Sequence, residues 1–232
     1  MSDRVQRFNK TERIAHWVNA ILFIILFLTG MAIFFQSIAL ALGHSGFAVT
    51  RFLHRMAAVP FILVVPVMMI LGTPKTTKVW LKEIFTWTMD DVRWVTGFAK
   101  EFFGGHANLP PQGKLNAGEK INSLLGIIGC GLLVFSGLVM WFSTHFSPTA
   151  VLVAYAVHDM AAAVVGAAII GHSYLGLFHP DSKRALSGMI DGTVSKEFAK
   201  AHHEKWYRSL SKDHLTLVEI PQNHSGQEST PM

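Results

Sequence analysis

Four histidines stand within or at the edge of long apolar stretches: His16, His54, His158 and His172. Polar side chains are costly in such stretches, so each is a candidate functional group, although an imidazole near a helix end can also sit among polar headgroups. His158 and His172 are fourteen residues apart, which is almost four helical turns. Their rings therefore share one helix face, at levels about 21 Å apart along the axis. Neutral imidazoles are common metal ligands.

The segments that carry these histidines have the length and composition of membrane spans. Half of the 232 residues are apolar, 15% are charged, and the mean hydropathy is +0.36, which favours a membrane protein over a soluble domain. A spanning helix needs about 20 mostly apolar residues. Pro60 and Pro66 are expected to bend the second span. We expect four spans, at about residues 14–35, 52–71, 121–142 and 151–178.

The segments outside the spans are more polar. Trp80, Trp87 and Trp94 are seven residues apart, which predicts one amphipathic helix that lies at the headgroup level or packs on a partner protein. Residues 1–210 are expected to form one four-helix domain. Within it, residues 180–210 are predicted to form a water-exposed helical tail, whereas residues 211–232 are predicted to be disordered.

Lys and Arg are distributed unevenly over these segments. Eighteen of the twenty lie before the first span, between the second and third spans, or in the tail, and the other two are Arg51 and Arg55. By the positive-inside rule, both termini and the amphipathic segment are cytoplasmic, which predicts a multi-pass protein of a bacterial inner membrane. The net charge of +5 thus flanks spans and does not indicate nucleic-acid binding. The single cysteine, Cys130, excludes internal disulfides and thiolate metal cages.

This topology sorts the histidines into two levels. His16 begins the first span on the cytoplasmic side, whereas His54 begins the second span on the periplasmic side. The fourth span enters from the periplasmic side, so His158 pairs with His54, and His172 with His16. Two stacked bis-histidine sites in an apolar bundle are what two b-type haems require, whereas zinc or copper needs more ligands at one level. The sequence therefore predicts an all-α membrane protein, a four-helix bundle that binds two b-type haems.

Two charges accompany the periplasmic pair of histidines. Arg55 follows His54 and Asp159 follows His158, so each charge lies about 100° around its helix from the ligand. We expect Arg55 either to hold a haem propionate or to pair with Asp159, because an unpaired buried charge is costly. The alternative is that both side chains project into water at the membrane surface.

Several motifs together resemble the gamma subunit, a cytochrome b, of membrane-bound respiratory formate dehydrogenase. They are "RIAHW" from Arg13, "RFLH" from Arg51, "KLNAGEK" from Lys114, "HDMAAAVVGAAIIGH" from His158 and "SGMIDGTVSKEFAKAHHEKWYR" from Ser187. The resemblance covers residues 13–210 and implies the same two haem pairs. It departs at Arg55 and Asp159 from a well-known member of the family, which has uncharged residues there.

The resemblance also implies a quinone pocket at Asn116 and Gly118, beside His172, for menaquinone or ubiquinone. An amide can hydrogen-bond a quinone carbonyl, and a glycine lets the ring approach the backbone. From its position alone, Asn116 is predicted to be a helix cap, and the two roles are compatible. Glu119 and Lys120 are candidate proton carriers from the cytoplasm.

The implied partners are a periplasmic iron–sulfur beta subunit and a molybdenum- or tungsten-containing catalytic alpha subunit. Electrons from formate would pass through the two haems to the quinone. The chain alone is not expected to oxidise formate, because its sequence offers no pterin site and no cluster ligands. Two alternatives stay open. One is the b-type haem subunit of another quinone-linked oxidoreductase, such as a hydrogenase or thiosulfate reductase, and the other is a haem-free membrane anchor or transporter.

Overall fold

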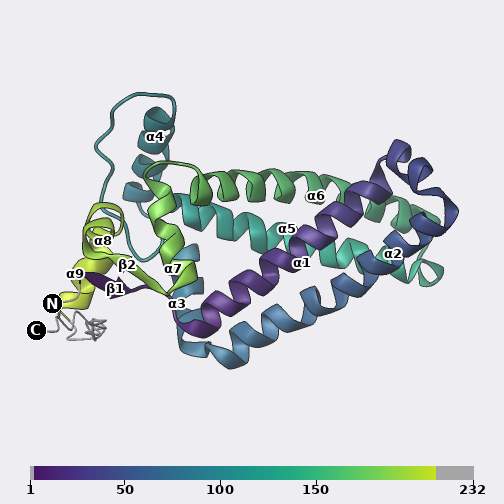
Figure 1. The fold of residues 1–232 in the computed structure, drawn as a ribbon, viewed down its shortest axis with the longest axis horizontal. Coiled ribbons are helices and arrows are strands. Elements are labelled where there is room, and N and C mark those ends of the chain that lie inside the picture. Colours follow the sequence, from purple (N-terminus) through teal and green to yellow (C-terminus); the bar gives the residue numbers. More distant parts are fainter. Residues whose placement is uncertain (1–2, 213–232) are drawn as a thin grey trace, which may run out of the picture.

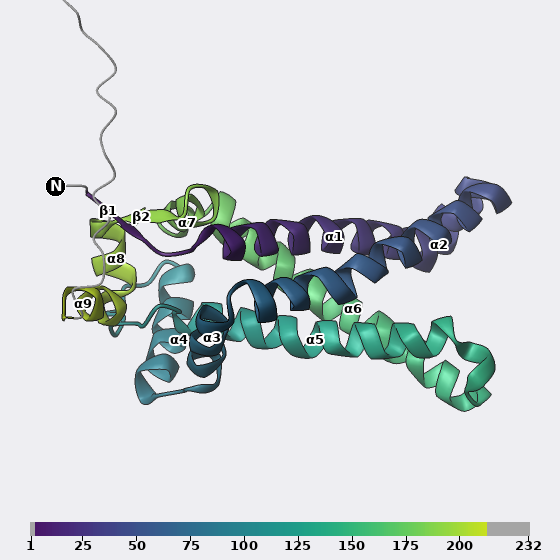
Figure 2. The same cartoon turned by 90° about the horizontal axis from the view of Figure 1, so that it is seen from below.

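A computed structural model describes residues 3–212, and within them four long helices run side by side (Figure 1). These are α1 (Lys10–Phe34), α2 (Gln36–Val67), α5 (Ala117–Trp141) and α6 (Pro148–Leu177). Each is long and apolar enough to cross a membrane, which confirms the predicted four-helix membrane architecture. The helices form two hairpins, α1 with α2 and α5 with α6 (Figure 2). Large apolar side chains such as Leu63, Ile128 and Val164 are exposed on these helices, as lipid contact requires.

Two of the spans begin at reciprocal side-chain caps. Asn9 accepts a hydrogen bond from the backbone N–H of Glu12, whose side chain accepts one from the N–H of Asn9. Asn116 and Glu119 do the same at the start of α5. Such a capping box satisfies backbone donors that a helix N-terminus leaves unpaired, and so it fixes where the helix starts.

The second span differs from its predicted bounds. Helix α2 begins at Gln36, well before the expected residue 52, and Gly43, which lies between the first two expected spans, forms a kink within the helix. Gly43 has a φ of 66°, a conformation that favours glycine. At the other end, α2 contains Pro60 and Pro66 and passes into a π-helical turn, η1 (Met68–Gly72). Proline removes a backbone donor, so a distortion of this kind is expected there.

The segment between the hairpins forms two helices, α3 (Pro74–Phe85) and α4 (Met89–Phe102). The prediction of one continuous helix through the three tryptophans is therefore wrong. Thr88 and Asp91 form a capping box that starts a new helix, and a side chain that caps competes with helix continuation. Trp87 lies in the break, where its indole N–H donates to the carbonyl of Ile84.

The two ends of the described chain meet in a terminal module, which consists of β1, β2 and the short helices around β2. Strand β1 (Arg4–Gln6) pairs antiparallel with β2 (Thr193–Ser195), so that Val5 lies opposite Val194. The helices are η3 (Ser182–Ala185), α7 (Leu186–Ile190), α8 (Lys196–His202) and α9 (Glu204–Lys212). Val5, Val194, Phe198 and Ala199 form its buried core. The predicted tail is thus mostly helical, with an added strand, and the expected disorder beyond Lys212 lies outside the described residues.

Helices α5 and α6 approach closely at Gly129. A Cβ there would stand 2.2 Å from Cγ2 of Val165, whereas a Cβ at Gly131, on the opposite side of α5, would meet nothing within 4 Å. We expect Gly129→Ala to reduce the free energy of unfolding by about 1–3 kcal/mol, because the helices must separate. Gly131→Ala should leave it unchanged or slightly higher. Thermal unfolding in detergent compares the two, and equal midpoints would contradict the close approach.

Candidate functional site

The four histidines meet in two pairs at two levels of the bundle. His16 of α1 faces His172 of α6 with ring centroids 6.3 Å apart, and His54 of α2 faces His158 of α6 with centroids 6.4 Å apart. These are the pairs that the sequence predicts from topology. Helix α6 contributes one ring to each pair, so the rise of a single helix fixes the separation of the two levels.

The separation of the paired rings fits one metal ion between them. Metal–imidazole bonds are about 2.0–2.1 Å long and a ring nitrogen lies about 1.1 Å from the ring centre, so two imidazoles on opposite sides of a metal have centroids about 6.3 Å apart. Both observed distances match this value. In the part of the chain that the structure describes, no group of three or more His, Cys, Asp or Glu side chains could hold a metal. Each pair would therefore supply two nitrogen ligands to a metal whose other positions a macrocycle fills, and haem, when bound, would supply one-electron redox chemistry there.

The charges next to the His54–His158 pair are not paired with each other. The guanidinium of Arg55 lies over the ring of Trp141, 5.6 Å from its centroid, which is a cation–π contact. Among residues 3–212, no ion pair within 4.0 Å joins Arg55 to Asp159. Of the two roles expected for Arg55, the pairing with Asp159 is not formed: Arg55 contacts Trp141, and Asp159 is exposed, as the alternative expects. The contact to a haem propionate stays a prediction.

Asn116 and Gly118 lie at the first turn of α5. Asn116 is the helix cap that its position predicts, and its side-chain oxygen is engaged by the N–H of Glu119 at 2.9 Å. Its amide NH2 group is therefore the part that can donate to a ligand. At Gly118, a Cβ would lie 3.1 Å from Cζ3 of Trp94, so the glycine lets an aromatic ring approach the backbone. In the structure, that ring is the indole of Trp94.

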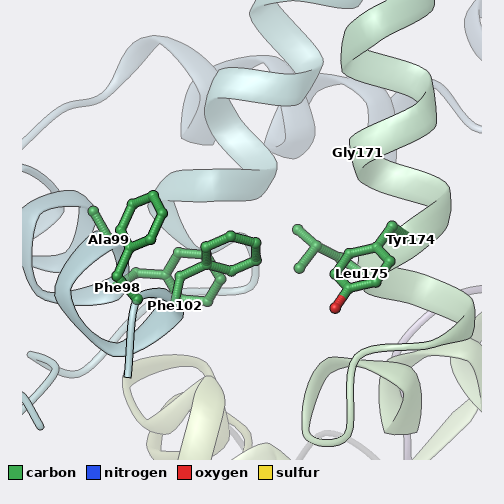
Figure 3. Close-up of a pocket in the computed structure, with 7 residues that line it drawn as sticks. Phe98, Ala99, Phe102, Gly171, Tyr174 and Leu175 are labelled. Carbon is green, nitrogen blue, oxygen red and sulfur yellow. The ribbon is translucent and has the colours of Figure 1, made fainter. Parts of the chain in front are cut away.

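An apolar cavity of about 320 Å³ opens between α4 and α6 (Figure 3). Phe98 and Phe102 line it from α4, and Tyr174 and Leu175 face them from α6, with Gly171 directly before His172. Trp94 stacks on Phe98 at 4.8 Å, so aromatic rings continue from Gly118 to the cavity. Sequence reasoning missed this cavity, since phenylalanines in an amphipathic helix are typical of packing. Phe98 and Phe102 are four residues apart, which places both rings on one helix face, and this spacing could have indicated the cavity wall.

The two candidate proton carriers are held in ion pairs. Glu119 accepts two hydrogen bonds from the Arg7 guanidinium, at 2.9 and 3.0 Å, and Arg7 is almost fully buried. Lys120 donates to the carboxylate of Asp91 at 2.8 Å, and both side chains are buried. These pairs attach Arg7, directly after strand β1, and α4 to the start of α5, which gives both residues a structural role.

His203 of the terminal module is buried beside these charges. Its Nδ1 lies 3.0 Å from the carbonyl oxygen of Gly113, to which the ring donates. Burial, followed by the positive charge of Arg7, lowers the pKa of His203 to about 4, although Glu119 acts in the opposite direction. His203 is therefore neutral in the folded module at neutral pH.

We expect the terminal module to lose stability as the pH falls from about 6.5 to 4. An unfolded histidine has a pKa of about 6.5, whereas His203 in the folded module binds its proton only at about pH 4. The unfolded state therefore binds more protons in this window, and the loss reaches about 3 kcal/mol at its lower end. His203→Gln should flatten this dependence. Thermal unfolding of both proteins at pH 7 and pH 5 tests it, and an identical pH dependence would contradict the assignment.

Comparison with known proteins places these features in a family. The family model described as prokaryotic cytochrome b561 matches residues 7–192. The cytochrome b556(fdo) subunit of formate dehydrogenase from Escherichia coli (strain K12) is 28% identical over 90% of this chain and 95% of that protein. The cytochrome b556 subunit of Haemophilus influenzae formate dehydrogenase is 27% identical over 90% of this chain and 85% of that protein. The nitrate-inducible cytochrome b556(Fdn) subunit of formate dehydrogenase from Escherichia coli (strain K12) is 25% identical over 91% of this chain and 94% of that protein.

These matches confirm the resemblance to formate dehydrogenase cytochrome b subunits that the sequence motifs indicate. A cytochrome b carries b-type haem, so the alternative of a haem-free anchor or transporter is set aside. The match to the family model extends over most of the described chain and includes all four paired histidines. The chain is a multi-pass membrane protein that belongs to the prokaryotic cytochrome b561 family.

Proposed function

We propose that this chain is the membrane cytochrome b subunit of a formate dehydrogenase and carries electrons through two bis-histidine haems to a quinone. The observation that carries the proposal is the presence of two histidine pairs at metal-ligating separation, 6.3 and 6.4 Å, each with one ring on α6. The names of the three relatives support formate as the source of the electrons.

The chain contributes ligands, spacing and a dry environment. Haem, when bound, supplies one-electron redox chemistry at each level. His54 and His158 would hold it near the periplasmic face, where an iron–sulfur subunit and a molybdenum or tungsten catalytic subunit dock. His16 and His172 would hold it near the cytoplasmic face. Arg55, whose guanidinium lies over the ring of Trp141, is next to the periplasmic pair in the sequence and is the candidate partner of a haem propionate.

The quinone is proposed to bind beside the cytoplasmic pair. Asn116 offers amide N–H groups to a quinone carbonyl, since its oxygen already caps α5. The apolar cavity next to His172, lined by Phe98, Phe102 and Tyr174, suits the ring or isoprenoid tail of menaquinone or ubiquinone. Gly171, which lines this cavity, directly precedes His172, a proposed haem ligand.

The proposed orientation puts both termini in the cytoplasm of a bacterium, with the spans in its inner membrane. Strands β1 and β2 pair, so the two ends of the described chain lie together at one end of the bundle (Figure 1). An even number of spans requires this arrangement. The charge distribution favours the cytoplasm for that end.

Haem counting in the purified complex tests the proposal. We expect a pyridine haemochrome assay to give two haems b per chain, and formate to produce b-type bands in a reduced-minus-oxidised spectrum of membranes. One haem or none would overturn the two-level arrangement. Reduction of the haems by hydrogen in place of formate would overturn the assigned partner and favour a hydrogenase, and reoxidation of quinol-reduced haems by thiosulfate would favour a thiosulfate reductase.

A further inference from the structure

The two histidines of the periplasmic pair are held by the same arrangement on different helices. Oγ1 of Thr29, on α1, lies 2.9 Å from Nδ1 of His54 on α2. Oγ of Ser136, on α5, lies 3.0 Å from Nδ1 of His158 on α6. In each hairpin, therefore, the second helix supplies the histidine and the first helix supplies a hydroxyl group to it.

The other contacts of the hydroxyls fix the direction of these hydrogen bonds. Thr29 donates to the carbonyl of Ile25, one turn back, at 2.7 Å. Ser136 donates in the same way to the carbonyl of Leu132 at 2.5 Å. A hydroxyl has a single proton, so each hydroxyl accepts from the histidine, and Nδ1 is the protonated ring nitrogen. This arrangement leaves Nε2 with its lone pair available for a metal.

A glycine follows each hydroxyl residue and lies against the same ring. A Cβ at Gly30 would stand 3.4 Å from Cε1 of His54, and a Cβ at Gly137 would stand 3.4 Å from Cε1 of His158. The two imidazoles therefore rest on bare backbone while their N–H groups are bound. The hydroxyl and the glycine together set the position and rotation of each ring.

The other histidine pair lacks this support. Nδ1 of His16 is buried and has no hydrogen-bond partner among residues 3–212. Within the same residues, no side-chain hydrogen bond is made by His172, and its ring faces that of His16. The two levels thus differ in one specific respect, namely whether the ligand N–H groups are hydrogen-bonded.

A histidine that donates its second N–H is a more basic metal ligand. A more basic axial ligand stabilises ferric over ferrous iron and so lowers the midpoint potential, which second-shell hydrogen bonds are known to tune. We propose that Thr29 and Ser136 are positioning residues that lower the potential of the periplasmic haem below that of the cytoplasmic haem. Electron transfer from the periplasmic level toward the quinone is then downhill. This inference rests on the proposed two-haem function.

A redox titration of the purified complex tests the inference. In Thr29→Val/Ser136→Ala, we expect the potential of the lower-potential haem to rise. At a fixed potential its ferric-to-ferrous ratio falls roughly tenfold, which is about 59 mV for a one-electron couple. The other haem should titrate as in the wild type. The low-spin ferric EPR signal should change as well, because it reports the relative orientation of the two imidazole planes.

Matched variants separate the hydrogen bond from other effects. Thr29→Ser keeps the hydroxyl and should keep the wild-type potential. Thr50→Val removes another hydroxyl that bonds one turn back, to the carbonyl of Gly46. Among residues 3–212 this hydroxyl makes no hydrogen bond to a histidine, so the variant should change neither potential. If the double variant loses haem, the single variants Thr29→Val and Ser136→Ala each keep one hydrogen bond and should show a smaller upward shift.

The outcomes distinguish this inference from the proposed function. Two haems in the wild type, with unchanged potentials in the hydroxyl variants, would overturn the inference and leave the function standing. Fewer than two haems in the wild type would overturn the function itself. A shift of the higher-potential haem in place of the lower one would also overturn the inference.

Discussion

His172→Ala is expected to remove one of two haems and to abolish quinone reduction, while the partner subunits continue to oxidise formate with an artificial dye. His172 faces His16 at 6.3 Å, and its neighbour Gly171 lines the α4–α6 cavity. Loss of this imidazole removes an axial ligand and alters the wall of the proposed quinone site together. The haem held by His54 and His158 should still be reduced by formate.

The companion variant His158→Ala gives the opposite pattern. It should remove the haem at the periplasmic level, so that formate no longer reduces the remaining haem but added quinol does. His145→Ala replaces an exposed histidine in the loop between α5 and α6 and should change neither haem content nor activity. Loss of the dye activity in His172→Ala would contradict its assigned role, as would retention of two haems.

The bundle and its histidine pairs follow from patterns that are local in the sequence. Each apolar stretch is long enough to be recognised alone, and the fourteen-residue spacing of His158 and His172 places both rings on one face before any contact is known. Successive spans run in alternating directions, and this alternation decides which histidines meet. The observed pairs at 6.3 and 6.4 Å follow from these features.

Features that depend on contacts between distant segments were not predictable in this way. Thr29 and Ser136 are ordinary hydroxyls in apolar helices, which usually bond only to their own backbone, and nothing local shows that a histidine on the next helix lies above them. Strand β1 has three residues and gains its partner from β2 near the other end of the chain. Trp87 shares the seven-residue spacing of its neighbours, yet the cap formed by Thr88 overrides that periodicity.

The second large effect is expected at the buried ion pair between Lys120 and Asp91. Their side chains are 9% and 4% exposed, and Lys120 Nζ lies 2.8 Å from Asp91 Oδ1. Asp91→Asn should lower the free energy of unfolding by about 3–5 kcal/mol, because it leaves the ammonium group buried without its counter-charge. Burial raises the pKa of Asp91, but hydrogen bonds from Lys120 and Thr88 outweigh it and hold the pKa below its usual value. The contribution of this ion pair to the free energy of unfolding is therefore complete at neutral pH, and it is lost only as the pH falls through the lowered pKa of Asp91.

Two further variants show whether this loss is electrostatic. Asp90→Asn changes the adjacent residue, whose partners Lys205 and Arg93 are largely exposed, and should cost at most about 1 kcal/mol. The double variant Asp91→Asn/Lys120→Met should recover most of the stability, since no unpaired charge then remains buried. Thermal unfolding of the detergent-solubilised protein compares all three. Equal losses at positions 90 and 91, or no recovery in the double variant, would mean that the pair stabilises α4 through packing and capping rather than through charge.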